Sequence, residues 1–236
     1  PPVYGPQVSL LFAPLAWLPY EAAMYVWMVA TVAAYGLCCW VVWRHCAHLR
    51  HCPWLVALLA AGAPALRFTL AFAQASAVGL LCMTGAYCAL RAKRPFLAGV
   101  AFGALAYKPT LGIAICVTVV AAAEWRIFAG SALSAIGQIT VGCLFWGWPI
   151  VGAYASALRR LPELAAGMEP HKYHMHSWRA VFELAGFTSS AALAAYAAVS
   201  VPILWLVVRC WRSGGPVDLR FAALSIACVL VDPHMY

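Results

Sequence analysis

The chain has 236 residues, of which 65% are hydrophobic and only 9% are charged, and its mean hydropathy is +0.85. Soluble domains carry about 25% charged residues, so this composition excludes an ordinary soluble domain and indicates an integral membrane protein. The formal net charge of +8 does not indicate nucleic-acid binding, because the basic residues of membrane proteins gather in loops that face anionic lipid.

Apolar runs set the expected membrane segments, because a spanning helix needs about 20 mainly apolar residues. Residues 9–19 are too short to span and fit an interfacial or re-entrant piece. The pair of runs that meets at Lys108-Pro109 is broken there, since proline cannot continue a helix. We therefore predict an all-α, polytopic transmembrane bundle of about eight segments, at residues 20–43, 53–66, 74–90, 95–107, 110–123, 127–151, 187–208 and 217–231.

Lysine and arginine divide unequally between the two sets of connections. The positive-inside rule places the richer set in the cytoplasm. The chain start, Arg67, Lys108, a longer loop at 152–186 and the chain end then face outward, which in a bacterial inner membrane is the periplasm. The set assigned to the cytoplasm comprises Arg44, Arg50, Arg91, Lys93, Arg94, Arg126, Arg209, Arg212 and Arg220.

The two ends of the sequence do not resemble natural termini. The chain opens on Pro1-Pro2 without an initiator methionine and stops at Met235-Tyr236. We expect an internal fragment that forms a single transmembrane domain, residues 1–236, with at least one helix upstream and further helices downstream.

Arg67 and Lys108 interrupt apolar sequence on the predicted outer side. A cation near hydrocarbon costs roughly 2.5–3.5 kcal/mol on insertion scales and by default indicates a functional site. Two cations on one side of the membrane suggest an anionic, lipid-linked ligand. Structural alternatives stay open, because Arg67 can extend to the interface without a ligand and Lys108 can cap the carbonyls of the preceding helix.

Other outward-facing polar residues extend the candidate site. Gln74 and Asp232 are candidate substrate ligands, although an interhelical hydrogen bond and a solvated helix end are equally ordinary roles for them. His174 and His234 can donate protons or hydrogen bonds near neutral pH. Tyr4 and Trp178 can stack on a sugar ring or line the membrane interface.

Histidine and cysteine residues do not predict a metal centre. His171, His174 and His176 match no strong zinc spacing, and the segment 45–52, which holds three His and two Cys, is a short turn whose basic residues oppose cation binding. Most of the ten cysteines lie inside apolar runs and act as small hydrophobic residues. We expect neither a metal nor another cofactor.

Four segments occur in an order that resembles one enzyme family. Residues 1–6 read Pro-Pro-Val-Tyr-Gly-Pro and precede an apolar Pro-Leu stretch; residues 72–76 read Phe-Ala-Gln-Ala-Ser; residues 98–110 contain Ala-Gly and then Lys-Pro; residues 232–236 read Asp-Pro-His-Met-Tyr. They resemble the Tyr-Pro-Pro, Gly-Gln-Xaa-Ser/Asn, Ala-Gly…Lys-Pro and Pro-His-Xaa-Tyr elements of glycosyltransferase family 87, integral membrane enzymes of the GT-C class. Ala73 stands where the family has glycine.

The resemblance implies an inverting transferase that moves a hexose, mannose above all, from a polyprenyl-phosphate donor to a hydroxyl of a lipid or glycan acceptor outside the cytoplasm. It also implies a catalytic aspartate just upstream of the Tyr-Pro-Pro segment. This sequence begins after that point, so no residue here takes the catalytic role and we expect the fragment alone to be inactive. The expected ligands of the donor phosphate are Arg67, Lys108 and His234, and those of the substrate are Tyr4, Gln74, His174 and Asp232.

Two other function classes fit parts of the pattern. A transporter or flippase for a lipid-linked or anionic substrate is favoured by short segments interrupted by proline, such as 95–123, but not by the lack of two related halves. A noncatalytic membrane scaffold leaves Arg67 and Lys108 unexplained.

Overall fold

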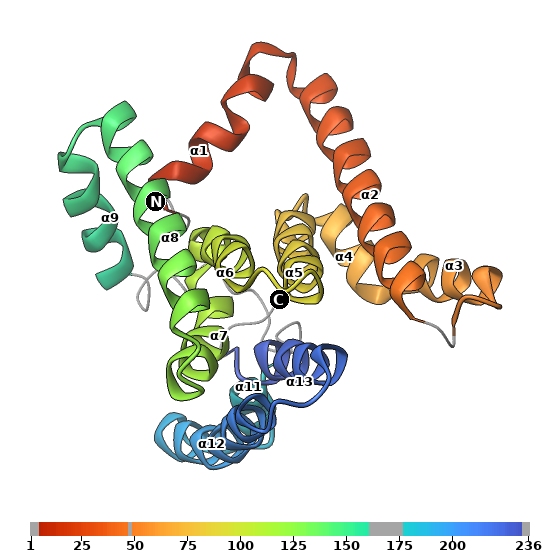
Figure 1. The fold of residues 1–236 in the computed structure, drawn as a ribbon. Helices are drawn as coiled ribbons and strands as arrows, with labels where there is room; N and C mark the ends of the chain where they lie inside the picture. The colour runs from red at the N-terminus through yellow and green to blue at the C-terminus, as the bar shows by residue number, and fades with distance from the viewer. Residues whose placement is uncertain (1–4, 47–48, 161–176, 233–236) are drawn as a thin grey trace.

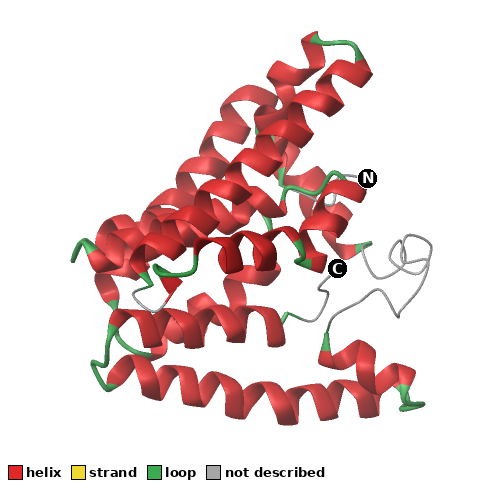
Figure 2. Cartoon of the chain, turned by 90° about the vertical axis from the view of Figure 1, so that its right-hand side faces the viewer, coloured by secondary structure: helices red, strands yellow, loops and turns green. Residues whose placement is uncertain are grey.

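The computed structural model describes residues 5–46, 49–160 and 177–232, and every secondary-structure element in these ranges is a helix (Figures 1 and 2). The prediction of an all-α fold is confirmed. The elements are α1 (Pro6–Phe12), η1 (Ala13–Trp17), α2 (Tyr20–His45), α3 (Pro53–Ala61), α4 (Pro64–Ala71), α5 (Ser76–Arg91), α6 (Pro95–Gly103), η3 (Ala104–Tyr107), α7 (Pro109–Ala121), α8 (Trp125–Trp146), α9 (Pro149–Arg159), α11 (Trp178–Leu184), α12 (Ser189–Arg212) and α13 (Val217–Leu230).

The prediction of about eight membrane segments is wrong. In the described part of the chain, three helices (α2, α8 and α12) are long and apolar enough to span a membrane, and a fourth span exists if α3 and α4, bent by 44° at their junction, are counted as one. The 16 residues of α5 reach only about 24 Å, less than the roughly 30 Å of a hydrocarbon core. The other short helices are limited by proline. Helices α3, α4, α6 and α7 each have proline in their first turn, so each begins as a new helix there.

The boundary between the sixth run and the predicted outer loop also differs. The expected segment 127–151 ends early, since α8 stops at Trp146 and Gly147 takes a φ of +79° before α9 begins. Positive φ suits glycine because it has no Cβ. The predicted loop 152–186 is helical at both described ends, in α9 and α11.

Helix α6 forms the centre of the bundle, between α5 and α8 (Figure 1). Its Gly99 and Gly103 face the backbone of α8 so closely that an added Cβ would overlap the carbonyl oxygens of Ile127 and Ser131. Two hydrogen bonds join the same helices: the Ser131 hydroxyl donates to the Gly99 carbonyl at 3.0 Å, and the Gln138 amide donates to the Gly103 carbonyl at 2.9 Å. Backbone approach through small residues is the usual way in which helices pack without a hydrophobic driving force in lipid.

The helix ends that carry the predicted cytoplasmic cations meet in space. Arg91 at the end of α5 pairs with Asp218 at the start of α13 at 2.8 Å. Arg212 at the end of α12 donates to the carbonyl of Ala121, the last residue of α7, at 2.9 Å. These links join the basic ends of α5 and α12 to the ends of α13 and α7.

Candidate functional site: an apolar cleft with a lysine at one end

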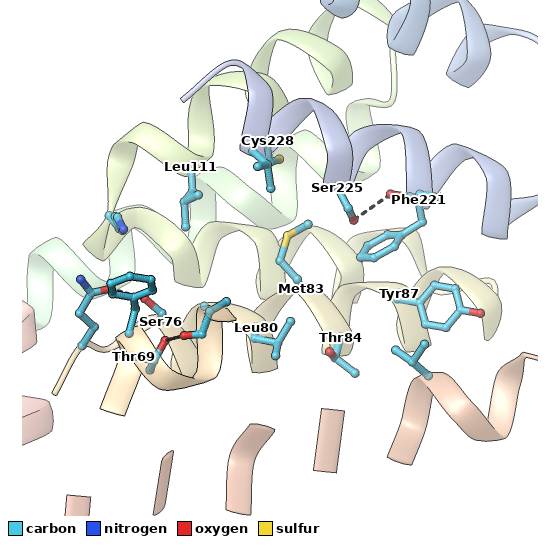
Figure 3. A pocket seen from close by; sticks show the side chains of 18 of the residues that line it. Thr69, Ser76, Leu80, Met83, Thr84, Tyr87, Leu111, Phe221, Ser225 and Cys228 are labelled. Atoms are coloured by element: carbon cyan, nitrogen blue, oxygen red, sulfur yellow. Dashed lines mark hydrogen bonds between the residues drawn. The ribbon is translucent and has the colours of Figure 1, made fainter. Parts of the chain in front are cut away.

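A cleft of about 870 Å³ lies among α4, α5 and α13 (Figure 3). Six residues of α5 line it at helical spacing, which places them on one face, and six residues of α13 do the same. The two helices run in opposite directions along the cleft, because Tyr87 near the end of α5 faces Phe221 near the start of α13, with ring centroids 5.1 Å apart. Residues of α2, α4 and α7 also line the cleft, among them Val42 and His45 of α2. The lining residues on the two long walls are Ser76, Gly79, Leu80, Met83, Thr84 and Tyr87 from α5, and Asp218, Phe221, Ala222, Ser225, Cys228 and Val229 from α13.

Lys108 lies at one end of this cleft, here called the mouth, with Gln74 and Ser76. It is the N-cap residue of α7, and its backbone N–H donates to the Leu105 carbonyl at 2.8 Å, which fixes the chain at the break. The half-buried Lys108 ammonium group has no hydrogen bond or ion pair with another described residue. An uncompensated cation at the N-terminal end of a helix creates positive potential at the mouth.

Gln74 is held at the mouth by the end of α4. Ala73 adopts a left-handed conformation, with φ +47°, and the Gln74 N–H donates back to the Thr69 carbonyl at 3.0 Å. This pattern is a Schellman C-cap. The Ser76 hydroxyl donates to Gln74 Oε1 at 3.0 Å, so the amide nitrogen of Gln74 is the group left to donate toward a ligand.

Asp232 lies just beyond the end of α13, 1% exposed, and its Oδ2 accepts a hydrogen bond from Thr110 Oγ1 at 3.0 Å. Thr110 is in the first turn of α7, where the helix dipole favours negative charge. The preceding carbonyl, of Val231, accepts from the Tyr196 hydroxyl at 2.6 Å. Asp232 does not line the cleft, and its hydrogen bond ties the end of α13 to the first turn of α7, next to Lys108.

The opposite end of the cleft is a polar cluster of Tyr87, Arg91 and Asp218. The Tyr87 hydroxyl donates to Asp218 Oδ1 at 2.8 Å, and one Arg91 nitrogen donates to both carboxylate oxygens at 2.8 and 3.0 Å. The Tyr87 hydroxyl, followed by Arg91, holds the pKa of the Asp218 carboxyl below its usual value, so the carboxylate is charged at neutral pH. The pair is solvent-exposed, at 38% and 59%, and contributes at most about 1 kcal/mol to stability.

A comparison with protein families identifies the chain. The model of glycosyltransferase family 87 matches residues 3–233, nearly the whole length. The chain belongs to glycosyltransferase family 87. It is therefore a membrane glycosyltransferase, with a sugar donor and an acceptor as substrates. No curated protein and no solved structure matches it.

Ala73 has a left-handed backbone at a position where the family resemblance implies glycine, so its effect on stability can be tested. Left-handed backbone costs a residue with a Cβ roughly 1–2 kcal/mol. We expect Ala73→Gly to raise the free energy of unfolding by about 1 kcal/mol, measured as a higher melting temperature of the purified protein. Ala123→Gly is the matched control, because Ala123 has a φ of +59° in the same type of cap after α7.

The two variants separate strain from function. Both are expected to gain stability by similar amounts, and only Ala73→Gly is expected to alter turnover, since Ala73 precedes Gln74. If Ala73→Gly lowers the melting temperature while Ala123→Gly raises it, the account of strain at Ala73 is incorrect.

The other predicted site residues do not line the cleft or lie outside the described residues. Arg67 is exposed on α4 and does not line the cleft, whereas Phe68 and Thr69, its neighbours, do. Tyr4, His174 and His234 lie outside the described residues. Trp178 begins α11, and its indole nitrogen is buried without a partner among the described residues.

The described residues offer no group of three or more His, Cys, Asp or Glu side chains able to hold a metal ion. The histidines at 171, 174 and 176 lie outside the described residues. Tyr87 and Asp218 were not predicted from the sequence, since they are 131 residues apart in the chain. Their only local signal was an acidic residue in the first turn of a short apolar helix.

Proposed function

We propose that the intact protein transfers a hexose, mannose first among the candidates, from polyprenyl phosphate to a hydroxyl group of a lipid or glycan acceptor on the outer face of the membrane. The observation that carries this proposal is the combination of an apolar cleft with a lysine, Lys108, that has no partner among the described residues. A polyprenyl phosphate has the matching two parts, an anion joined to a long hydrocarbon.

The proposed reaction is a direct displacement with inversion. The acceptor oxygen bonds to the anomeric carbon while the bond from that carbon to the phosphate oxygen breaks, and its electron pair leaves on the phosphate. The acceptor proton passes to a general base, which the family resemblance assigns to an aspartate just before the Tyr-Pro-Pro segment. Charge grows on the departing phosphate, so a fixed cation near it stabilises the transition state more than it would in water.

The proposal gives each described residue one role. Lys108 binds the departing phosphate, and the amide nitrogen of Gln74 donates to the phosphate or to a sugar hydroxyl. Asp232 holds the first turn of α7 through Thr110. Arg67 supplies a second, weaker cation, because its exposed position on α4 lets it reach the phosphate only from outside the cleft.

The residues outside the described ranges keep the roles that were predicted for them from the sequence. His234 and His174 are proposed as donors to the phosphate or the acceptor, and Tyr4 is proposed to stack on a sugar ring. A divalent metal is not required, because a lipid monophosphate leaving group carries less charge than a nucleotide diphosphate. The bundle is proposed to share the GT-C architecture, placed in a bacterial inner membrane with the mouth toward the periplasm.

A donor-choice assay tests the function. The full-length protein in lipid nanodiscs is mixed with membrane glycolipid acceptors and one of two donors. Both donors carry labelled mannose, attached either to polyprenyl phosphate or to guanosine diphosphate. We expect a new glycosidic bond and released polyprenyl phosphate with the lipid-linked donor only. Label transferred only from the nucleotide would reject the proposal of a lipid-linked donor. If the protein in liposomes moves the lipid-linked donor across the bilayer and forms no new bond, the transferase proposal is rejected in favour of a transporter.

A further inference from the structure

The cleft has a defined length, which two helices report independently. Along α5, Tyr87 follows Ser76 by eleven residues, and along α13, Val229 follows Asp218 by eleven residues. At a rise of 1.5 Å per residue each wall is about 16 Å long. The walls between the two ends are largely apolar, with Leu80, Met83 and Phe221 on them (Figure 3).

Both ends of the cleft are polar, and they differ in kind. The mouth holds the ammonium group of Lys108, which pairs with no other residue in the described part of the chain. In the cluster of Tyr87, Arg91 and Asp218, hydrogen bonds of 2.8–3.1 Å pair the two charges with each other. A hydrocarbon chain that advanced past Tyr87 would have to desolvate this ion pair without offering a partner, which is unfavourable. A hydrocarbon in the cleft therefore ends, or turns out, before the cluster.

The sides of the cleft permit a turn outward. Leu80 and Phe68, on neighbouring helices, are 37% and 38% exposed although they line the cleft. Lipid against such exposed apolar side chains is as favourable for a hydrocarbon as the cleft interior. A tail longer than the cleft can thus continue into the bilayer.

We infer that the cleft recognises only the first three or so isoprene units next to the phosphate, and that the rest of the lipid tail contributes nothing to binding. An isoprene unit adds four carbon–carbon bonds of about 1.5 Å to the chain and so extends it by about 5 Å. Three units match the wall length. This inference rests on the proposed function, since it assigns the donor phosphate to Lys108, and it defines the substrate class as any prenyl phosphate of at least that length.

The test is a length series of prenyl monophosphates with one, two, three, four and eleven isoprene units. Their binding to the full-length protein in nanodiscs is measured by competition with a labelled prenyl phosphate. The concentration of each prenyl phosphate is corrected for its partitioning into the bilayer. We expect affinity to rise by roughly threefold per unit through the third unit, as packed atoms gain dispersion contacts. It should then stay constant from four to eleven units.

Two substitutions block the cleft at different distances from the mouth. Ser225 is four residues from Val229 and Ala222 is seven, which correspond to about 6 Å and 10 Å along α13. We expect Ser225→Phe to move the plateau to about one isoprene unit and Ala222→Phe to about two. Ile226→Phe is the control, because Ile226 is 59% exposed, next to Ser225 but not in the cleft lining. It should leave the plateau at three.

The outcomes distinguish this inference from the proposed function. If prenyl phosphates bind through Lys108 but affinity keeps rising to eleven units, the length limit is overturned and the donor assignment stands. If Lys108→Ala leaves the binding of every prenyl phosphate unchanged, the proposed function fails as well. If another segment of the full-length protein fills the cleft, Ser225→Phe and Ala222→Phe will not shift the plateau, and the inference is overturned. Melting temperatures confirm that the compared variants are folded.

Discussion

Replacing Gly99 with valine is expected to remove at least about 3 kcal/mol from the free energy of unfolding, a large part of the 5–15 kcal/mol that a typical protein has. A side chain at Gly99 would overlap the backbone of Ile127, and a carbonyl oxygen cannot rotate away as the end of a flexible side chain can. The same close approach recurs at Gly130, where an added Cβ would meet the carbonyl of Phe96. The two helices must then separate, and the Ser131 hydrogen bond to Gly99 is lost.

Gly137→Val is the matched control for this prediction. Gly137 is in the same helix, α8, but apart from the adjoining backbone no atom of the described residues lies within 4 Å of an added Cβ, so only the intrinsic helix preference changes. The melting temperature of each variant is measured in detergent, and the elution profile of the folded protein is measured separately by size-exclusion chromatography. A Gly99→Val protein that elutes as a single species with the melting temperature of Gly137→Val would show that α6 and α8 do not pack as described.

Sequence patterns predicted the positions of most helices well, but not which of them are long enough to span the membrane. Residues 20–43 and 187–208 are unbroken apolar runs, and they appear as α2 and α12 with boundaries shifted by at most four residues. The shorter runs carry the same hydrophobicity, but proline and glycine divide them into helices too short to cross a bilayer alone. Hydropathy cannot tell such a helix from a spanning one, because packing within the bundle compensates for the length that each helix lacks.

The mouth of the site could be predicted from sequence, whereas the cleft could not. Lys108 and Gln74 stand out as polar residues in apolar surroundings, and both line the cleft. Arg67 has the same local signal but lies outside the lining, since only the packing of α4 decides which side of the helix faces the cavity. The apolar walls require α5 and α13 to meet, and a single sequence carries no local sign of that contact between segments more than 120 residues apart.

The central claim of the account is that Lys108 binds the phosphate that leaves with the lipid. It predicts that Lys108→Ala in the full-length protein lowers turnover with a polyprenyl-phosphate sugar by about 100-fold, the equivalent of about 2.7 kcal/mol of transition-state stabilisation. Lys108→Arg keeps the charge but not the shape of the ammonium group, so it is expected to retain at least a tenth of the activity. Arg67→Ala is expected to lose less than tenfold.

The measurement that decides the claim is the steady-state rate of hexose transfer by wild type and Lys108→Ala, at equal amounts of folded protein in the same nanodiscs. Arg126→Ala removes an equivalent charge from the start of α8, away from the cleft lining, and serves as the control. A 100-fold loss confined to Lys108→Ala is the predicted result. Turnover in Lys108→Ala equal to that of wild type and Arg126→Ala would contradict the account.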